Sequence, residues 1–143
     1  MRLYRLTERM ARLSQTLEKN SVRKMKTIAL AVQEELVINT PIDVGTAESN
    51  WIGSIGAPHS GTIKALVPGS KASTYIETVG KSVAKFKAVV RKARTGDKIY
   101  LVNNVPYIGL LNKGRSWQSP PQFIQTAIAR GTAAGKKINM LRD

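Results

Sequence analysis

Few side chains in this sequence are of the types that carry out acid–base or nucleophilic chemistry. The single histidine, His59, lies in a loop rich in proline and glycine, with no acidic residue near it. Asp43 and Glu48 are too isolated to suggest a pair of catalytic carboxylates, and Asp97 is best explained as a turn residue. We therefore expect no catalytic residue, and we expect that the chain is not an enzyme.

Cofactor, metal and thiol chemistry also lack candidates. The chain has no cysteine, which excludes disulfides, thiolate metal ligands and thiol nucleophiles. It contains no glycine-rich phosphate loop and no dinucleotide-binding fingerprint. The hydroxyl side chains are not paired with a credible base. The sequence thus predicts no cofactor and no metal site.

Charge is the strongest feature of the composition. The 143 residues hold 23 Lys and Arg against 9 Asp and Glu, a net charge of +14. Such an excess favours a polyanionic partner, namely DNA, RNA, an anionic membrane face or an acidic surface on another protein. Only residues 41–70 are not basic. No zinc-finger, RNP or helix-turn-helix signature is present, so DNA contact would be non-specific, and a solvated helix face is the alternative explanation. The basic side chains that we consider for such contact are Lys81, Lys85, Lys87, Arg91, Lys92 and Arg94.

A long N-terminal helix is predicted to end by Asn39, because the following Thr40-Pro41 disfavours helix. Thr7 is its expected N-cap. A membrane-surface helix is the rival interpretation, but the interspersed glutamates oppose it. The apolar side chains repeat every three or four residues, and we expect them to face the core: Leu6, Met10, Leu13, Leu17, Met25, Ile28, Val32 and Leu36. No apolar run is long enough to cross a bilayer, and we expect no signal peptide.

The rest of the chain alternates short strands with helices. Two strands, Ser49–Ile55 and Thr62–Val67, are expected on either side of a turn at 57–61. A second helix, capped by Ser73 or Thr74, should reach about Ala93. A strand over Lys98–Asn103, a helical turn over Tyr107–Leu111 ended by Gly114, and a final helix opened by Pro120-Pro121 should follow.

This order of elements predicts a single α+β domain over residues 1–143. It combines a long N-terminal helix, a small and mostly antiparallel sheet, a second central helix and a short C-terminal helix. Beyond Gly131, residues 132–143 are small and basic, and we expect them to form a flexible tail.

The first of two informative stretches reads Thr-Pro-Ile-Asp-Val-Gly-Thr-Ala over residues 40–47 and is followed by Ser-Asn-Trp over 49–51. Thr40 and Pro41 would close the first helix. Asp43 can bond to the backbone and fix the turn before Gly45, where glycine permits a conformation that other residues resist. Trp51 would anchor the turn to the core.

The second stretch spans residues 103–120 and contains three short motifs. Prolines and a glycine would hold an ordered loop, and Tyr107 and Trp117 would offer amphipathic contact area. Both stretches could equally serve only to shape a compact fold. The residues that we single out here are Asn104, Pro106, Tyr107, Gly114, Ser116, Gln118 and Pro120.

Together the two stretches resemble the tailed-phage neck and minor tail proteins, also called tail-completion proteins, the family that includes the minor tail protein Z of phage lambda. The correspondence covers roughly residues 32–130. Two departures stand out, since Val44 replaces a usual threonine and Asn112 stands where glutamate is common. If that glutamate pairs with a neighbour's base, the contact is altered here.

The resemblance implies a structural virion protein of the neck or head-proximal tail, assembled in the bacterial cytoplasm. Its partners would be copies of itself in a ring, which we expect to be six-fold, together with connector or head-closure proteins and tail-tube proteins. DNA passing through the channel is a further candidate partner, and no membrane partner is expected. The alternative is a basic protein that binds DNA phosphates non-specifically.

Overall fold

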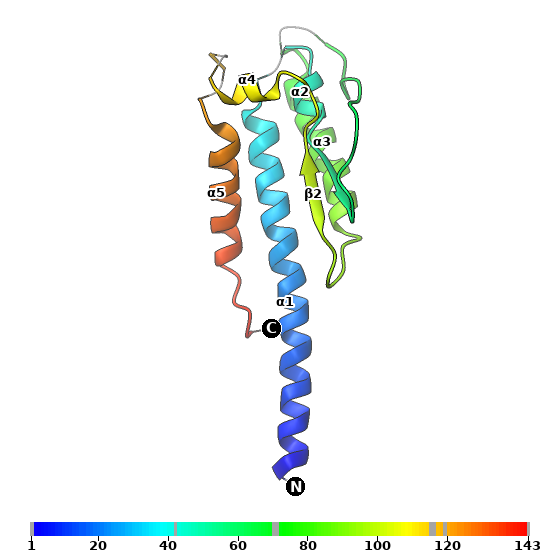
Figure 1. Ribbon diagram of the computed structural model, residues 1–143, viewed down its shortest axis with the longest axis vertical. Helices are drawn as coiled ribbons and strands as arrows, with labels where there is room; N and C mark the ends of the chain where they lie inside the picture. The colour runs from blue at the N-terminus through cyan, green and yellow to red at the C-terminus, as the bar shows by residue number, and fades with distance from the viewer. Residues whose placement is uncertain (1, 42, 70–71, 115–116, 119, 143) are drawn as a thin grey trace.

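One helix, α1, runs along most of the length of the structure (Figure 1). The computed structural model describes residues 2–41, 43–69, 72–114, 117–118 and 120–142. α1 spans Arg2–Asn39, which confirms a single unbroken helix ending before Thr40-Pro41. The expected cap at Thr7 is wrong, because the helix already begins at Arg2 and the Thr7 hydroxyl donates to the Leu3 carbonyl one turn earlier.

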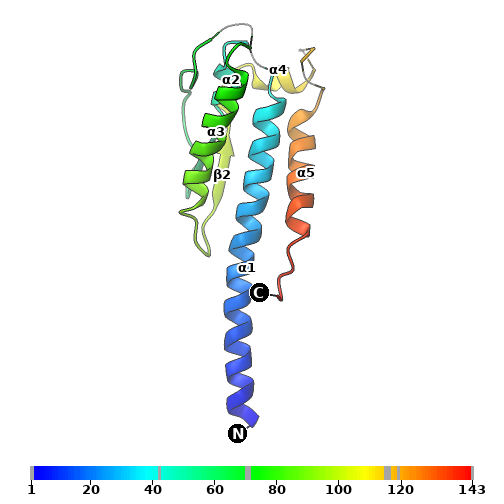
Figure 2. The ribbon, with the colours of Figure 1, turned by 180° about the vertical axis from the view of Figure 1, so that it is seen from behind.

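Six shorter elements follow and give an α+β fold, as expected. They are α2 (Thr46–Ser49), β1 (Ile52–Ile55), α3 (Tyr75–Val90), β2 (Ile99–Val102), α4 (Ile108–Asn112) and α5 (Phe123–Lys136). α5 lies along one side of α1, and α3 with the two strands lies on the other (Figures 1 and 2). The strands pair antiparallel, with Ile52 opposite Val102 and Ile55 opposite Ile99.

The expected hairpin between 49–55 and 62–67 is wrong. Residues 62–67 form no strand, and the partner of β1 is β2, which follows α3 in the chain. The first predicted strand also begins too early, since Ser49 belongs to α2. The strand expected at 98–103 is confirmed as β2, and the helical turn expected at 107–111 is confirmed as α4.

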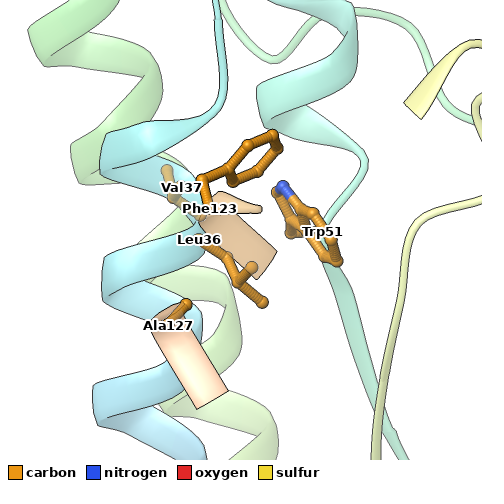
Figure 3. Close-up of a cluster of buried hydrophobic side chains, with 5 residues drawn as sticks. All are labelled: Leu36, Val37, Trp51, Phe123 and Ala127. Atoms are coloured by element: carbon orange, nitrogen blue, oxygen red, sulfur yellow. The ribbon is translucent and has the colours of Figure 1, made fainter. Parts of the chain in front are cut away.

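The core joins the end of α1 to the start of α5 (Figure 3). Leu36 and Val37 of α1 pack with Trp51, Phe123 and Ala127, and all five side chains are buried. Residues of α4 and β2 pack against this cluster from outside it, among them Ile108, Leu111 and Leu101. The core therefore lies at one end of α1, where the two stretches singled out in the sequence also lie.

Glycines allow α5 to approach α1 closely. A Cβ at Gly131 would lie 2.2 Å from Val32 Cγ2 and 2.9 Å from the Val32 backbone nitrogen, and one at Gly135 would lie 2.3 Å from Ile28 Cγ1. Gly131 is thus a packing position, and α5 continues past it to Lys136, into the segment 132–143 that we expected to form a tail.

The first half of α1 projects beyond the rest of the structure (Figures 1 and 2). The apolar side chains there do not face a core, which corrects the expectation from their spacing. Only the second half of the helix packs as expected, with Leu36 buried and Met25, Ile28 and Val32 half-buried. The exposed large hydrophobic side chains of the first half are Leu3, Tyr4, Leu6, Met10, Leu13 and Leu17.

The C-terminal segment turns back to the middle of α1. The Asn20 side chain is buried there, and its Nδ2 donates to the carbonyls of Asn139, Met140 and Arg142 at 3.3, 3.1 and 2.6 Å. This polar contact marks the boundary between the packed half of α1 and the projecting half.

Candidate functional site

The turn that follows α1 is locked by one indole. Trp51 Nε1 donates to Thr40 Oγ1 at 2.7 Å, and Thr40 Oγ1 donates to the Leu36 carbonyl at 2.6 Å. Both residues are buried. Since a buried indole needs a hydrogen-bond partner, the threonine after α1 and the tryptophan before β1 fix each other. This confirms that Trp51 anchors the turn to the core.

Gly45 begins α2 with a φ of +81°, the left-handed conformation that we expected to require glycine. A Cβ there would lie 3.5 Å from Thr78 Oγ1 of α3. Asp43 is exposed, and its backbone carbonyl accepts a hydrogen bond from Ala72 N at 3.0 Å. The side-chain bond expected at Asp43 stays a prediction. The turn thus places α2 against α3.

Glu48 of α2 is fully buried, which its isolated place in the sequence did not suggest. Neither carboxyl oxygen has a hydrogen-bond partner among the described residues. Desolvation raises the pKa of Glu48 to about 8. Burial first, and then the Glu48 charge, raise the pKa of Tyr75 at the start of α3. Glu48 is therefore a neutral acid over much of the physiological range, and burial accounts for its raised pKa.

Two polar side chains hold the 62–67 segment in place of a strand partner. Asn50 Oδ1 accepts from Ile63 N at 2.8 Å, and Asn50 Nδ2 donates to the Ile63 carbonyl at 2.9 Å. Ser49 Oγ accepts from Leu66 N at 3.0 Å. The backbone bonds that we expected from a β-ladder are supplied by side chains of the first stretch. Thr74 acts in the same way, because its hydroxyl donates to the Val67 carbonyl and does not cap α3.

The asparagines of the second stretch tie it to the first. Asn103 Nδ2 donates to the Ala47 carbonyl of α2 at 2.8 Å, and Asn103 Oδ1 accepts from Val105 N at 3.1 Å. Asn104 Nδ2 donates to the carbonyls of His59 and Gly61, both at 3.0 Å. His59 thus takes part through its backbone. The two stretches, more than fifty residues apart in sequence, meet at one end of the fold.

The loop from α4 to α5 is held by Asn112 and Gly114. Asn112 Oδ1 accepts from Ile124 N at 3.0 Å, and its Nδ2 donates to Gln125 Oε1 at 2.9 Å. Gly114 has a φ of +86°, and a Cβ there would lie 3.1 Å from Pro121 Cβ. Asn112 therefore serves the start of α5 within its own chain.

The remaining residues of the second stretch lie on the surface. Trp117 is 93% exposed and Tyr107 is 42% exposed, and Pro106, Gln118 and Pro120 are exposed as well. Ser116 lies outside the described residues. The stretch thus combines a polar inner side that shapes the fold with aromatic side chains that face outwards.

The basic residues expected to contact DNA are all exposed: Lys81, Lys85, Lys87, Arg91, Lys92 and Arg94. The structure brings only Arg94 among them to a groove that also contains basic side chains of α1, namely Lys19, Arg23 and Lys26. This groove has a volume of about 530 Å³. Sequence reasoning missed these α1 residues, because they meet Arg94 only through the packing of α3 on α1.

The described part of the chain offers little else of chemical interest. No three His, Cys, Asp or Glu side chains gather within it as metal ligands would. No helix in it combines the length and apolar content that crossing a membrane requires. Comparison with family models, curated proteins and solved structures gave no match to this chain.

Proposed function

We propose that the chain is a structural subunit of the neck or head-proximal tail of a tailed phage. In this role it works in a ring that completes or caps the tail tube and joins it to the head connector. The ring requires contacts between copies that close around an axis. The part played by the chain is mechanical, and no residue in it needs to react with a substrate.

The observation that supports this role is the convergence of the two family-like stretches on one end of the fold. Asn103 of the second stretch donates to the Ala47 carbonyl of the first, so the second stretch helps to hold the first in shape. Large apolar side chains at this end remain outside the core, as an assembly surface would require: Val44, Tyr107, Leu110 and Trp117.

The direct test is made in the phage whose genome encodes the chain. Deletion of the gene should leave heads and tails that do not join, and purified wild-type particles should contain the chain by mass spectrometry. Complementation with Trp117→Ser should fail or be strongly reduced. Complementation with Ile128→Ser, which removes an exposed apolar side chain from α5, should succeed. Mature particles that lack the chain would refute the role.

The groove lined by Lys19, Arg23, Lys26 and Arg94 favours a second candidate, non-specific binding of DNA phosphates. Duplex affinity should then fall steeply with salt. The double variant Arg23→Gln/Arg94→Gln should flatten the log–log salt slope by about 1.8, that is, about 0.9 for each lost phosphate contact. Lys85→Gln/Lys87→Gln removes the same charge outside the groove and serves as the control. A salt slope that neither variant changes would exclude this candidate.

A further inference from the structure

The projecting half of α1, residues 2–19, is called the arm here. Its apolar side chains form a seam of Leu3, Leu6, Met10, Leu13 and Leu17, with steps of three, four, three and four residues. Such alternation places all five on one narrow stripe and is the spacing of helices that pack against another helical or apolar surface. Their exposure runs from 79% at Leu3 to 36% at Leu17, and nothing in the described part of the chain covers them. The seam therefore has the pattern of a packed face without its partner.

An open apolar groove lies further along the same helix, between α1 and β2. Its volume is about 670 Å³. Met25, Ile28 and Val32 line it from α1, and Ile99, Tyr100 and Leu101 line it from β2. Met10 and Leu17 of the seam and Lys24 of the groove wall follow one another in steps of seven residues. Residues seven apart lie on nearly the same side of a helix, so the seam and the α1 wall of the groove lie on neighbouring parts of one helical face.

The arm of a chain cannot enter its own groove, because α1 is one continuous helix. A second copy can supply the arm. The seam is about 21 Å long and the α1 wall of the groove about 17 Å, taking 1.5 Å per residue over 3–17 and 21–32, so their lengths correspond.

The charges beside the seam allow this contact. In the heptad that the seam defines, the flanking positions within residues 3–17 hold Thr7, Arg9, Ser14 and Thr16, and Arg2 holds the flanking position before Leu3. The rim of the groove carries Lys24, Lys98 and Asp97. A flank of hydroxyl side chains can pass this rim with little like-charge repulsion, whereas a strongly basic flank would be repelled. The other basic side chains of the arm, Arg5, Arg12 and Lys19, occupy heptad positions away from the seam.

From these features we infer that the arm of one copy docks in the groove of a neighbouring copy, with the seam against Met25, Ile28, Val32 and the facing residues of β2. One surface gives the arm and a different surface receives it, which is the kind of contact that can close a ring. Only the closure of these contacts into a ring rests on the proposed function. The contact between two copies is inferred from the surfaces of the chain itself.

Mixing two variants tests the contact. Leu6→Glu/Leu13→Glu disables the arm and Ile99→Glu disables the groove, so each variant alone should be monomeric by sedimentation at concentrations where the wild type associates. A mixture of the two should associate, since the second variant still supplies an arm and the first still supplies a groove. Ala11→Glu/Gln15→Glu adds the same two charges to the arm away from the seam and should associate at least as strongly as the wild type. Association of the Ile99→Glu variant at wild-type strength would overturn the inference.

Disulfide trapping gives a test that does not depend on a destabilising charge. The chain has no native cysteine, so single Cys variants report only on the intended pair. Met10→Cys mixed with Ile99→Cys and oxidised should yield at least about ten times more crosslinked heterodimer than Ala11→Cys mixed with Ile99→Cys, because a disulfide needs Cα atoms within about 7 Å of each other. Met10→Cys homodimers as the main product would show that arms pair with arms, and equal yields in the two mixtures would show that the groove receives no arm. Either result overturns the inference.

These tests use purified protein and separate the two proposals. If no contact between arm and groove is found but mature particles contain the chain, only the docking of the arm is rejected. Trapping of the contact with no chain in the particles would reject the virion role alone.

Discussion

At the residue scale, Trp51 provides the sharpest link between sequence and fold. Trp51→Phe keeps the ring in the core but removes the Nε1 donor that binds Thr40 Oγ1 at 2.7 Å. In this variant Thr40 still donates to the Leu36 carbonyl, but its buried Oγ1 no longer accepts a hydrogen bond. We therefore expect the free energy of unfolding to fall by about 1–2 kcal/mol. The second tryptophan is the control, since Trp117 is 93% exposed and Trp117→Phe should change stability by less than about 0.5 kcal/mol. Urea unfolding followed by circular dichroism measures both. Equal effects would mean that the indole bond does not fix the turn.

Glu48 predicts a pH dependence of stability. Its pKa is raised from 4.5 to about 8 in the folded chain, so between these values the folded state holds a proton that the unfolded state has lost. The folded state is favoured in full below about pH 4.5, and this contribution is lost as the pH rises to about 8. Glu48→Gln carries no charge to bury and should be more stable than the wild type at pH 8 by about 1–3 kcal/mol, and similar to it at pH 5.

Urea titrations from pH 5 to pH 9 would measure this difference. Glu34→Gln, at an exposed position of α1, is the control for removing one carboxylate. It should leave the slope of stability against pH as it is in the wild type. Parallel profiles for Glu48→Gln and the wild type would show that the Glu48 carboxyl is hydrated in solution.

At the scale of elements, the contact of α5 with α1 depends on glycine. Gly131→Ala would place a Cβ 2.9 Å from the backbone nitrogen of Val32, which a side-chain rotation cannot relieve. The helices must separate, and we expect a loss of about 1–3 kcal/mol. Gly80→Ala is the matched control, because Gly80 is exposed within α3 and has no atom within 4 Å of the new Cβ. That change should stabilise the chain by about 0.5–1 kcal/mol. Thermal unfolding should show a lower midpoint temperature for Gly131→Ala and a higher one for Gly80→Ala. A higher midpoint for Gly131→Ala would mean that α5 is loosely packed.

The elements also show how far the sequence could be interpreted alone. Periodicity and Pro41 were sufficient for the long helix, for its end at Asn39 and for the later helices. The strand predicted at 62–67 is wrong, because Asn50 and Ser49 bind that backbone in place of a neighbouring strand, and no local pattern signals such a contact. Of the candidate site, the roles of Trp51 and Gly45 could be predicted from residue type. The burial of Glu48 and the groove at Arg94 could not, since both arise from packing between elements distant in sequence.

The arm shows a second limit of prediction from sequence, which concerns the partner of an apolar face. Its apolar spacing predicts a face that packs against a core, but nothing in the described part of the chain covers the seam. Helical periodicity reports that a face is apolar and cannot report whether its partner belongs to the same molecule. The spacing of Leu6 and Leu13 predicts a core, and the core that we infer for them forms between copies.

At the scale of the whole molecule, the net charge of +14 opposes contact between copies, while the docking surfaces that we infer are apolar. Repulsion between like-charged copies is screened by salt, whereas burial of apolar area is not weakened by it. Self-association should therefore strengthen as NaCl rises from about 50 mM to about 500 mM, a range over which the Debye length falls from about 14 Å to about 4 Å. We expect weak association or monomers at the lower end, in line with a subunit that forms rings only when a partner is present.

Binding to DNA phosphates must respond in the opposite way, because each phosphate contact releases counterions and loses affinity as salt rises. The same salt series, followed by sedimentation for the chain alone and by anisotropy with a labelled duplex, thus separates apolar self-association from DNA binding. Arm-in-groove contact predicts a rising association that Leu6→Glu/Leu13→Glu abolishes and Arg23→Gln/Arg94→Gln enhances, since the second change lowers the charge on each copy. Self-association that weakens with salt would mean that charged pairs join the copies, and the seam would then have no role in the contact.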